Sequence, residues 1–305
     1  MMMKIYAKAS LDVGEIREKV RCGCDGIEYN LCSDFACYGE NFTHNYPEEV
    51  FTLKNVEVVH VPFDNKGQMM NIERVFQRED LRPIRNVFRL AQYCAEYWGH
   101  RVLVVIHASI SFYDFMEYEL LRKRIERELG QLLCDFSMVD IAIENVVPME
   151  YKEERPYSPM LCNGIFTDIP QIVHYLRASF AERVGSVLDV CHAAMTRKYM
   201  TALLSAADFL PKGALPDKID YSMEHYFRAN QGICKLIHFN DFEKNGYGRA
   251  HGTVFQSQEK VDDLLKLYKY YGYDCPLTIE IREDNYLDCV NYRKTKTMIE
   301  HSRYQ

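Results

Sequence analysis

The sequence predicts an α/β protein built as a single (β/α)₈ TIM barrel, because short apolar runs alternate with helical patterns along the chain. The length and composition agree, since 305 residues of which 48% are apolar can bury one large core. In addition, six of the apolar runs end in His, Asp or Glu. Parallel barrel strands bring their carboxyl ends to one mouth, so such residues can meet there.

The eight strands are expected where Val, Ile and Leu cluster, at 4–9, 26–31, 56–61, 102–107, 139–145, 186–190, 235–239 and 276–281. Helical patterns separate them at 13–22, 114–133, 169–179, 197–206 with 222–230, 258–271 and 287–301. Pro47 can begin a short helix before the third strand, and Pro83 falls in the first turn of a helix that ends at Trp98. The regular alternation of strands and helices favours a barrel.

The chain is predicted to be one domain over residues 1–305 with two long connections. The segment 146–168 contains three Pro and leaves the mouth end of the fifth strand, which makes it a candidate lid or specificity loop. The segment 208–221 separates two helices after the sixth strand. A surface insertion, an oligomer contact and a substrate role all remain open for it.

The net charge of −7 argues against a protein-wide basic surface for nucleic acid, whose phosphates require one, while a local basic groove stays open. The basic run 121–127 alternates with Glu and indicates a solvated helix face. No apolar stretch reaches the roughly 18 to 20 residues that cross a bilayer, and the N-terminus lacks a secretory signal. We therefore expect a cytoplasmic protein that does not enter membranes.

The 11 Cys are scattered through a long chain, which favours reduced thiols over a disulfide framework. Cys22, Cys24, Cys32 and Cys37 lack paired C-x-x-C spacing, so a zinc site there is not favoured. The Tyr-rich stretch 268–273 can pack a homo-oligomer, although an outer barrel helix is an equally good place for it.

The residues at the ends of the predicted strands are of metal-ligand types. They are His60, His107, Glu144, Asp189 followed by His192, His238, and Glu280. Four of the 10 His lie there, and His251 follows in the loop after His238. Imidazoles and carboxylates without Cys suit Mn, Co or Zn. Glu144, Asp189, His238 and Glu280 form a set for one ion, and His60 and His107 can hold a second ion that Glu144 bridges. His192 and His251 remain for the substrate or for a third ion.

Four motifs carry a family resemblance: Ile143-Glu144-Asn145, Leu188 to His192, His238 to Asp241, and Leu277 to Glu280. With Asp25-Gly26-Ile27-Glu28 they span nearly the whole chain. The sequence resembles the xylose isomerase-like TIM-barrel superfamily, which includes sugar epimerases of the tagatose 3-epimerase type and the endonuclease IV family of abasic-site nucleases (AP endonuclease family 2).

The epimerase resemblance implies that Glu144, Asp189, His238 and Glu280 bind one divalent ion and that the two Glu exchange a proton with the substrate. A metal-bound carbonyl acidifies the adjacent carbon, so a nearby carboxylate can remove and return that proton. His192 would then hydrogen-bond a sugar hydroxyl. Glu28 would contact the sugar or form a salt bridge inside the barrel mouth.

The nuclease resemblance implies eight ligands for three zinc ions, at His60, His107, Glu144, Asp189, His192, His238, His251 and Glu280. The chain departs from that pattern at Arg249, where the family has an Asp, so we expect a weakened third site. Arg249 can instead bind a substrate phosphate or carboxylate, or be a surface residue.

The segment 32–46, in addition, contains no Arg or Lys with which to contact a DNA backbone. We therefore expect a metal-dependent isomerase or epimerase acting on a sugar or sugar phosphate, with a metal-dependent phosphodiester hydrolase as the alternative. A non-catalytic binding protein is a third possibility, and the retained carboxylates of Glu144 and Glu280 argue against it.

Overall fold

The computed structural model describes residues 3–32, 34–35, 41–62, 64–65, 68–77, 80–108, 115–146, 149–152, 155–159, 168–205, 222–241, 252 and 254–304. Eight parallel strands close into a barrel in the order β1-β12-β11-β10-β7-β6-β3-β2. These strands are β1 (Ile5–Ala9), β2 (Gly26–Asn30), β3 (Val56–His60), β6 (Val102–His107), β7 (Val139–Glu144), β10 (Val184–Asp189), β11 (Cys234–Phe239) and β12 (Leu277–Ile279). The predicted (β/α)₈ barrel is confirmed.

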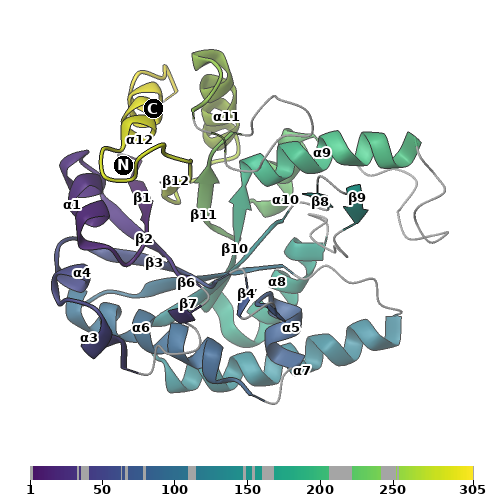
Figure 1. The fold of residues 1–305 in the computed structure, drawn as a ribbon. Coiled ribbons are helices and arrows are strands. Elements are labelled where there is room, and N and C mark those ends of the chain that lie inside the picture. The colour runs from purple at the N-terminus through teal and green to yellow at the C-terminus, as the bar shows by residue number, and fades with distance from the viewer. Residues whose placement is uncertain are drawn as a thin grey trace.

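Helices surround the strands (Figure 1). They are α1 (Val13–Arg21), α3 (Phe42–Asn45), α4 (Glu49–Thr52), α5 (Ile72–Gln77), α6 (Arg82–Trp98), α7 (Phe115–Asp135), α8 (Asp168–Phe180), α9 (Val190–Ser205), α10 (Met223–Asn230), α11 (Gln258–Tyr270) and α12 (Val290–Glu300), with a 3₁₀ turn at Ala181–Arg183. Asp12 caps α1 by accepting the Glu15 N–H, and Gly99 ends α6 at a φ of 70°. These local signals explain why the predicted and observed boundaries agree closely.

The start of α9 differs from the prediction, which began this helix at residue 197 rather than at Val190. Its first turn is capped by side chains from the barrel mouth. Asp189 accepts the N–H of His192 at 2.6 Å, and Asn240 accepts the N–H of Cys191 at 3.0 Å. The second cap comes from a different strand, and a local sequence pattern does not reveal it.

Two antiparallel hairpins supplement the barrel, β4 (Asp64–Asn65) with β5 (Gln68–Met69), and β8 (Met149–Lys152) with β9 (Arg155–Pro159). The second hairpin belongs to the long connection predicted at 146–168. The insertion predicted at 208–221 lies outside the described residues. Among the described residues, no helix is long and apolar enough to cross a membrane. The Cys residues that the structure describes are free thiols.

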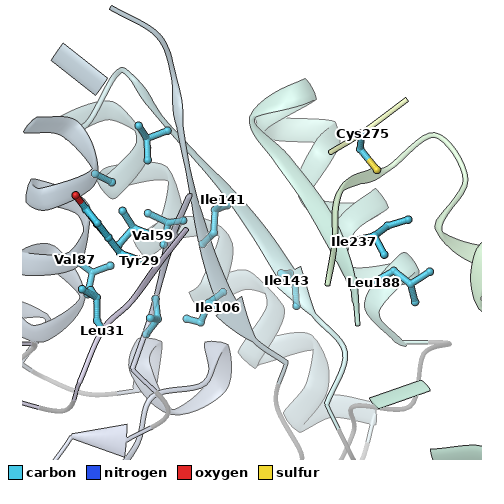
Figure 2. Close-up of a cluster of buried hydrophobic side chains, with 14 of the residues drawn as sticks. Tyr29, Leu31, Val59, Val87, Ile106, Ile141, Ile143, Leu188, Ile237 and Cys275 are labelled. Carbon is cyan, nitrogen blue, oxygen red and sulfur yellow. The ribbon is translucent and has the colours of Figure 1, made fainter. Parts of the chain in front are cut away.

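Strand residues alternate between two hydrophobic clusters. One is small and fills the barrel interior, with Tyr6, Val58, Val105, Ala142, Val187 and Leu236. The other lies between the strands and the helices, and Figure 2 shows Val59, Ile106, Ile143, Leu188 and Ile237 in it. Those five residues directly precede His60, His107, Glu144, Asp189 and His238. The outward packing of each apolar residue therefore turns the following polar side chain into the barrel.

Close packing of β10 against β11 gives a first testable prediction. A Cβ atom added at Gly185 would lie 2.8 Å from the Ile233 carbonyl oxygen, inside van der Waals contact with backbone. We expect Gly185→Ala to lower the free energy of unfolding by about 1–3 kcal/mol, measured by chemical denaturation. Gly99→Ala is the comparison, because its strain comes from φ alone and a Cβ there meets no atom within 4 Å. An unchanged stability of Gly185→Ala would mean that the two strands separate easily.

Candidate metal centre

A ring of eight polar side chains lies above the interior apolar layer, one from each barrel strand or its end. Its members are Lys8, Glu28, His60, His107, Glu144, Asp189, His238 and Glu280. Six of them stand two residues after an apolar residue of the barrel interior, as His60 stands after Val58. Because strand side chains alternate with a period of two, each pair points in the same direction.

The strand register pairs some of these residues directly. His107 pairs with Glu144 across β6 and β7, and Asp189 pairs with His238 across β10 and β11. His60 pairs with Asn30, the last residue of β2. Residues that are far apart in the sequence therefore lie together at one end of the barrel, as the strand ends predicted.

Glu144 lies at the centre of the ring and is 1% exposed. His60 Nε2 is 2.8 Å from Glu144 Oε2, and His238 Nδ1 is 3.0 Å from Glu144 Oε1. His107 Nε2 lies 3.5 Å from Oε2. Burial alone would raise the pKa of Glu144, but the charge of His238 and its hydrogen bond hold that pKa well below its usual range. The central carboxylate is therefore ionised.

His238 contacts carboxylates through both ring nitrogens. Nε2 is 3.1 Å from Glu28 Oε2, and Nδ1 is 2.9 Å from Glu280 Oε2. Burial disfavours the imidazolium, but Glu28 and Glu144 outweigh it and raise the pKa of His238 well above its ordinary value. A metal ligand must be a neutral imidazole, so an ion held by His238 would displace that proton.

Two asparagine side chains hold Asp189 in place. Asn240 Nδ2 donates to Asp189 Oδ2 at 2.8 Å, and the Asn145 side chain accepts the Asp189 N–H at 2.8 Å. The His192 ring bonds the Asn145 carbonyl at 2.8 Å. Such hydrogen bonds fix the direction of carboxylate and imidazole groups before any ligand arrives. They also explain why Asn145 and Asn240 sit within the conspicuous sequence motifs.

The sequence reasoning missed Lys8. Its ammonium group lies 2.6 Å from Glu280 Oε1 and 3.4 Å from Glu28 Oε1, with the side chain 10% exposed. Burial disfavours this charge, but Glu280 and Glu28 outweigh it and raise the pKa of Lys8 above its ordinary value. A sequence signal was present, because Lys8 stands two residues after the inward-facing Tyr6. Lys is not a metal-ligand type, so the pattern of His, Asp and Glu at the strand ends does not include it.

The donor set fits a divalent ion. There are three groups of residues in which the candidate ligand atoms lie within 4.8 Å of one another. They are Glu144, Asp189, His238 and Glu280; His60, His107 and Glu144; and Glu28, His60 and His238. Glu28 Oε1 is buried and has no hydrogen-bond partner among the described residues. The first two groups match the one-ion set and the two-histidine set expected from the sequence. Glu144 belongs to both.

The environment of His107 gives a pH-dependent prediction. Burial, together with the neighbouring histidines, outweighs Glu144 and lowers the pKa of His107 to about 3. An unfolded chain protonates this residue near pH 6.5. The contribution of neutral, buried His107 to the free energy of unfolding is therefore complete above about pH 6.5. It is lost as the pH falls toward 3, by about 1 kcal/mol per pH unit.

Chemical denaturation of metal-free protein between pH 7 and pH 5 measures this loss. His107→Gln, which cannot take up the proton, should lose less stability than wild type across the same interval. Equal slopes for the two proteins would contradict the assignment of a neutral, buried His107.

The other expected site residues have different outcomes. Glu28 is fully buried against His238 and Lys8, which matches the salt bridge inside the mouth rather than an exposed sugar contact. His192 is 5% exposed, with its ring against Asn145 and 3.6 Å from Glu144. Arg249 and His251 lie outside the described residues. The Tyr-rich stretch packs mainly within the chain, since Tyr268 and Tyr273 donate to backbone carbonyls, although Tyr270 is 75% exposed.

Comparison with protein-family models finds no match to the sequence, and comparison with curated proteins finds none either. Comparison of structures does find similar proteins. A 3-keto-D-glucoside 4-epimerase from E. coli superposes with a TM-score of 0.59 at 13% identity, covering 98% of this chain and 99% of that one. A xylose isomerase domain protein from Planctomyces limnophilus gives 0.59 at 12% identity, covering 97% and 94%.

A third similar structure is the IOLI protein with a bound zinc atom, with a TM-score of 0.56 at 16% identity, covering 98% of this chain and 97% of that one. At these identities the similarity establishes the fold. The similarity extends over almost the full length of each chain, so the whole barrel is shared. The protein has the fold of the xylose isomerase-like TIM barrels, as the resemblance of its strand-end motifs implied.

Proposed function

We propose that the protein is a divalent-metal-dependent isomerase or epimerase acting on a sugar or sugar derivative. The observation that carries this proposal is the set Glu144, Asp189, His238 and Glu280, whose ligand atoms lie within 4.8 Å of one another. Three carboxylates and one imidazole suit Mn, Co or Zn. The epimerase and the zinc-bound protein among the similar structures support the same reading.

A bound ion would polarise a substrate carbonyl and so acidify the adjacent carbon. The residues of this chain would then move the proton. Glu280 is the carboxylate best placed for this, because it is 14% exposed and lines a cavity of about 430 Å³ at the mouth. Glu144 lies deeper, with both oxygens within hydrogen-bond distance of histidines. We assign Glu280 as the first base and Glu144 as the carboxylate that holds the ion and supports return of the proton.

Proton exchange tests this proposal directly. Metal-loaded protein, incubated with a panel of ketoses and keto-sugars in deuterated water, should place deuterium on the carbon next to the carbonyl. Glu280→Gln should abolish the exchange, whereas Glu15→Gln should retain it, because Glu15 lines the same cavity but bonds Ser10 instead of the metal set. No deuterium in any sugar of the panel would contradict isomerase chemistry.

A metal-dependent phosphodiester hydrolase is the second candidate, and the group formed by His60, His107 and Glu144 favours it. Two ions sharing one carboxylate can stabilise both the attacking and leaving oxygens of a phosphoryl transfer. Elemental analysis of protein purified without chelator or metal-affinity tag separates the two candidates. About one ion per chain supports the isomerase, and two or three zinc ions per chain would move phosphodiesters and abasic DNA ahead of sugars.

A further inference from the structure

The cavity beside Glu280 is lined by residues from the ends of three neighbouring strands, β12, β1 and β2. Lys8 and Glu280, which contact the metal set, line the cavity. Arg282 and Tyr286, which follow Glu280 in the sequence, line it as well. Tyr286 is 46% exposed. A cavity of about 430 Å³ has the size of a small-molecule site. It adjoins the metal set directly, because Glu280 belongs to both.

The charges that line this cavity are unequally compensated. Glu280 Oε1 accepts a hydrogen bond from Lys8 at 2.6 Å. Glu15 accepts the backbone N–H of Ser10 at 3.1 Å and the Ser10 hydroxyl at 2.5 Å. The guanidinium of Arg282, by contrast, has no carboxylate within 4.0 Å among the described residues. Its positive charge is thus available to a ligand in the cavity.

The backbone that carries Arg282 is fixed. Its N–H donates to the Gly252 carbonyl at 3.2 Å, and its own carbonyl accepts from Asn291 Nδ2 at 2.8 Å. The next residue, Glu283, is buried and accepts the N–H groups of Asn291 and Tyr292 at the start of α12. Binding of an anion therefore does not have to order this backbone, and the planar guanidinium matches a planar or tetrahedral anion through two hydrogen bonds.

We propose that Arg282 binds an anionic group of the substrate, a phosphate or a carboxylate, while the carbonyl end of the same molecule reaches Glu280. The anion site rests on the cavity and on Arg282, and only the placement of the carbonyl rests on the proposed function. The substrate is then an acidic sugar derivative rather than a neutral sugar. Arg282 lies among the described residues that line the cavity, and the anion site does not require Arg249.

Titration calorimetry of the metal-loaded protein tests the anion site, with inorganic phosphate and acetate as probes. Arg282→Gln should weaken the binding of one probe by at least about tenfold, because a charge-assisted bidentate contact is lost. A loss for phosphate alone identifies a phosphorylated substrate, and a loss for acetate alone identifies a carboxylate. Arg127→Gln is the control, since Arg127 is 71% exposed on α7 and pairs with Glu128.

Two features keep this test decisive. Arg282→Lys keeps the charge but loses the two-pronged contact, so it should weaken binding to an intermediate degree and serves if Arg282→Gln does not fold. Repeating each titration with metal-free protein separates binding of the probe to the ion from binding at Arg282. Failure of both probes to bind wild type, or equal affinity in wild type and Arg282→Gln, overturns the proposal. The titration requires no turnover, so it can succeed or fail independently of deuterium exchange.

Discussion

Replacing Glu144 by Gln should remove the bound divalent ion and abolish turnover. Both carboxylate oxygens of Glu144 lie 2.8–3.0 Å from a histidine nitrogen. The substitution keeps the shape of the side chain but replaces one of these oxygens with an amide N–H donor. It also removes the negative charge at the point where two candidate ligand groups overlap. Loss of a residue that only hydrogen-bonds a metal ligand typically lowers metal affinity roughly 10- to 100-fold. Because Glu144 is itself a candidate ligand, we expect its loss to lower the affinity by at least this factor. Elemental analysis after gel filtration and the deuterium-exchange assay measure the two effects.

Asp140→Asn is the matched control for this experiment. Asp140 lies on the same strand, β7, and accepts hydrogen bonds from Arg101 at 2.7 Å and Lys235 at 3.1 Å at the opposite end of the barrel. Its loss should lower stability and leave the metal content unchanged. A Glu144→Gln protein that is fully metallated and active would show that the polar ring is a structural network and that catalysis, if any, lies elsewhere.

Replacing Lys8 by Met should destabilise the metal-free protein by about 3–5 kcal/mol, the usual result of removing one partner of a buried ion pair. Its ammonium faces Glu280 and Glu28, and without it both carboxylates lie near each other in a poorly solvated layer. A divalent ion neutralises the same carboxylates. The metal-loaded protein should therefore lose less stability than the metal-free protein. Chemical denaturation of both forms, with and without a saturating ion, gives the two differences.

Lys235→Met supplies the comparison for Lys8. Lys235 pairs with Asp140 at 3.1 Å, far from the mouth residues, so its removal should cost the two forms equally. Equal losses for Lys8→Met in the two forms would mean that Lys8 stabilises the barrel without any relation to the ion. A larger loss in the metal-loaded form would contradict the prediction and indicate that Lys8 supports binding of the ion.

The strands could be predicted from the sequence because barrel strands are buried on both faces and read as apolar runs of the correct length. The ligand types at their ends could be predicted for the same reason, since His107 and Glu144 directly end such runs. Lys8 was not recognised in this way, because Lys is not a metal-ligand type; its position two residues after Tyr6 indicates an inward side chain, and its distance to Glu280 reveals the ion pair. The early start of α9 likewise depends on Asn240, which is remote in sequence.

The hydrogen bond between Lys8 and Glu280 joins the first and last barrel strands across 272 positions of the chain. At the other end of the same strand pair, Leu277 donates its N–H to the Lys4 carbonyl at 3.0 Å, so the same seam closes the sheet. Loop-closure entropy makes such distant pairing a late event in folding. A chain that is still emerging from the ribosome has Lys8 and Glu28 but lacks Glu280 and the seam. The group Glu144, Asp189, His238 and Glu280 is therefore complete only when the ring of strands has closed.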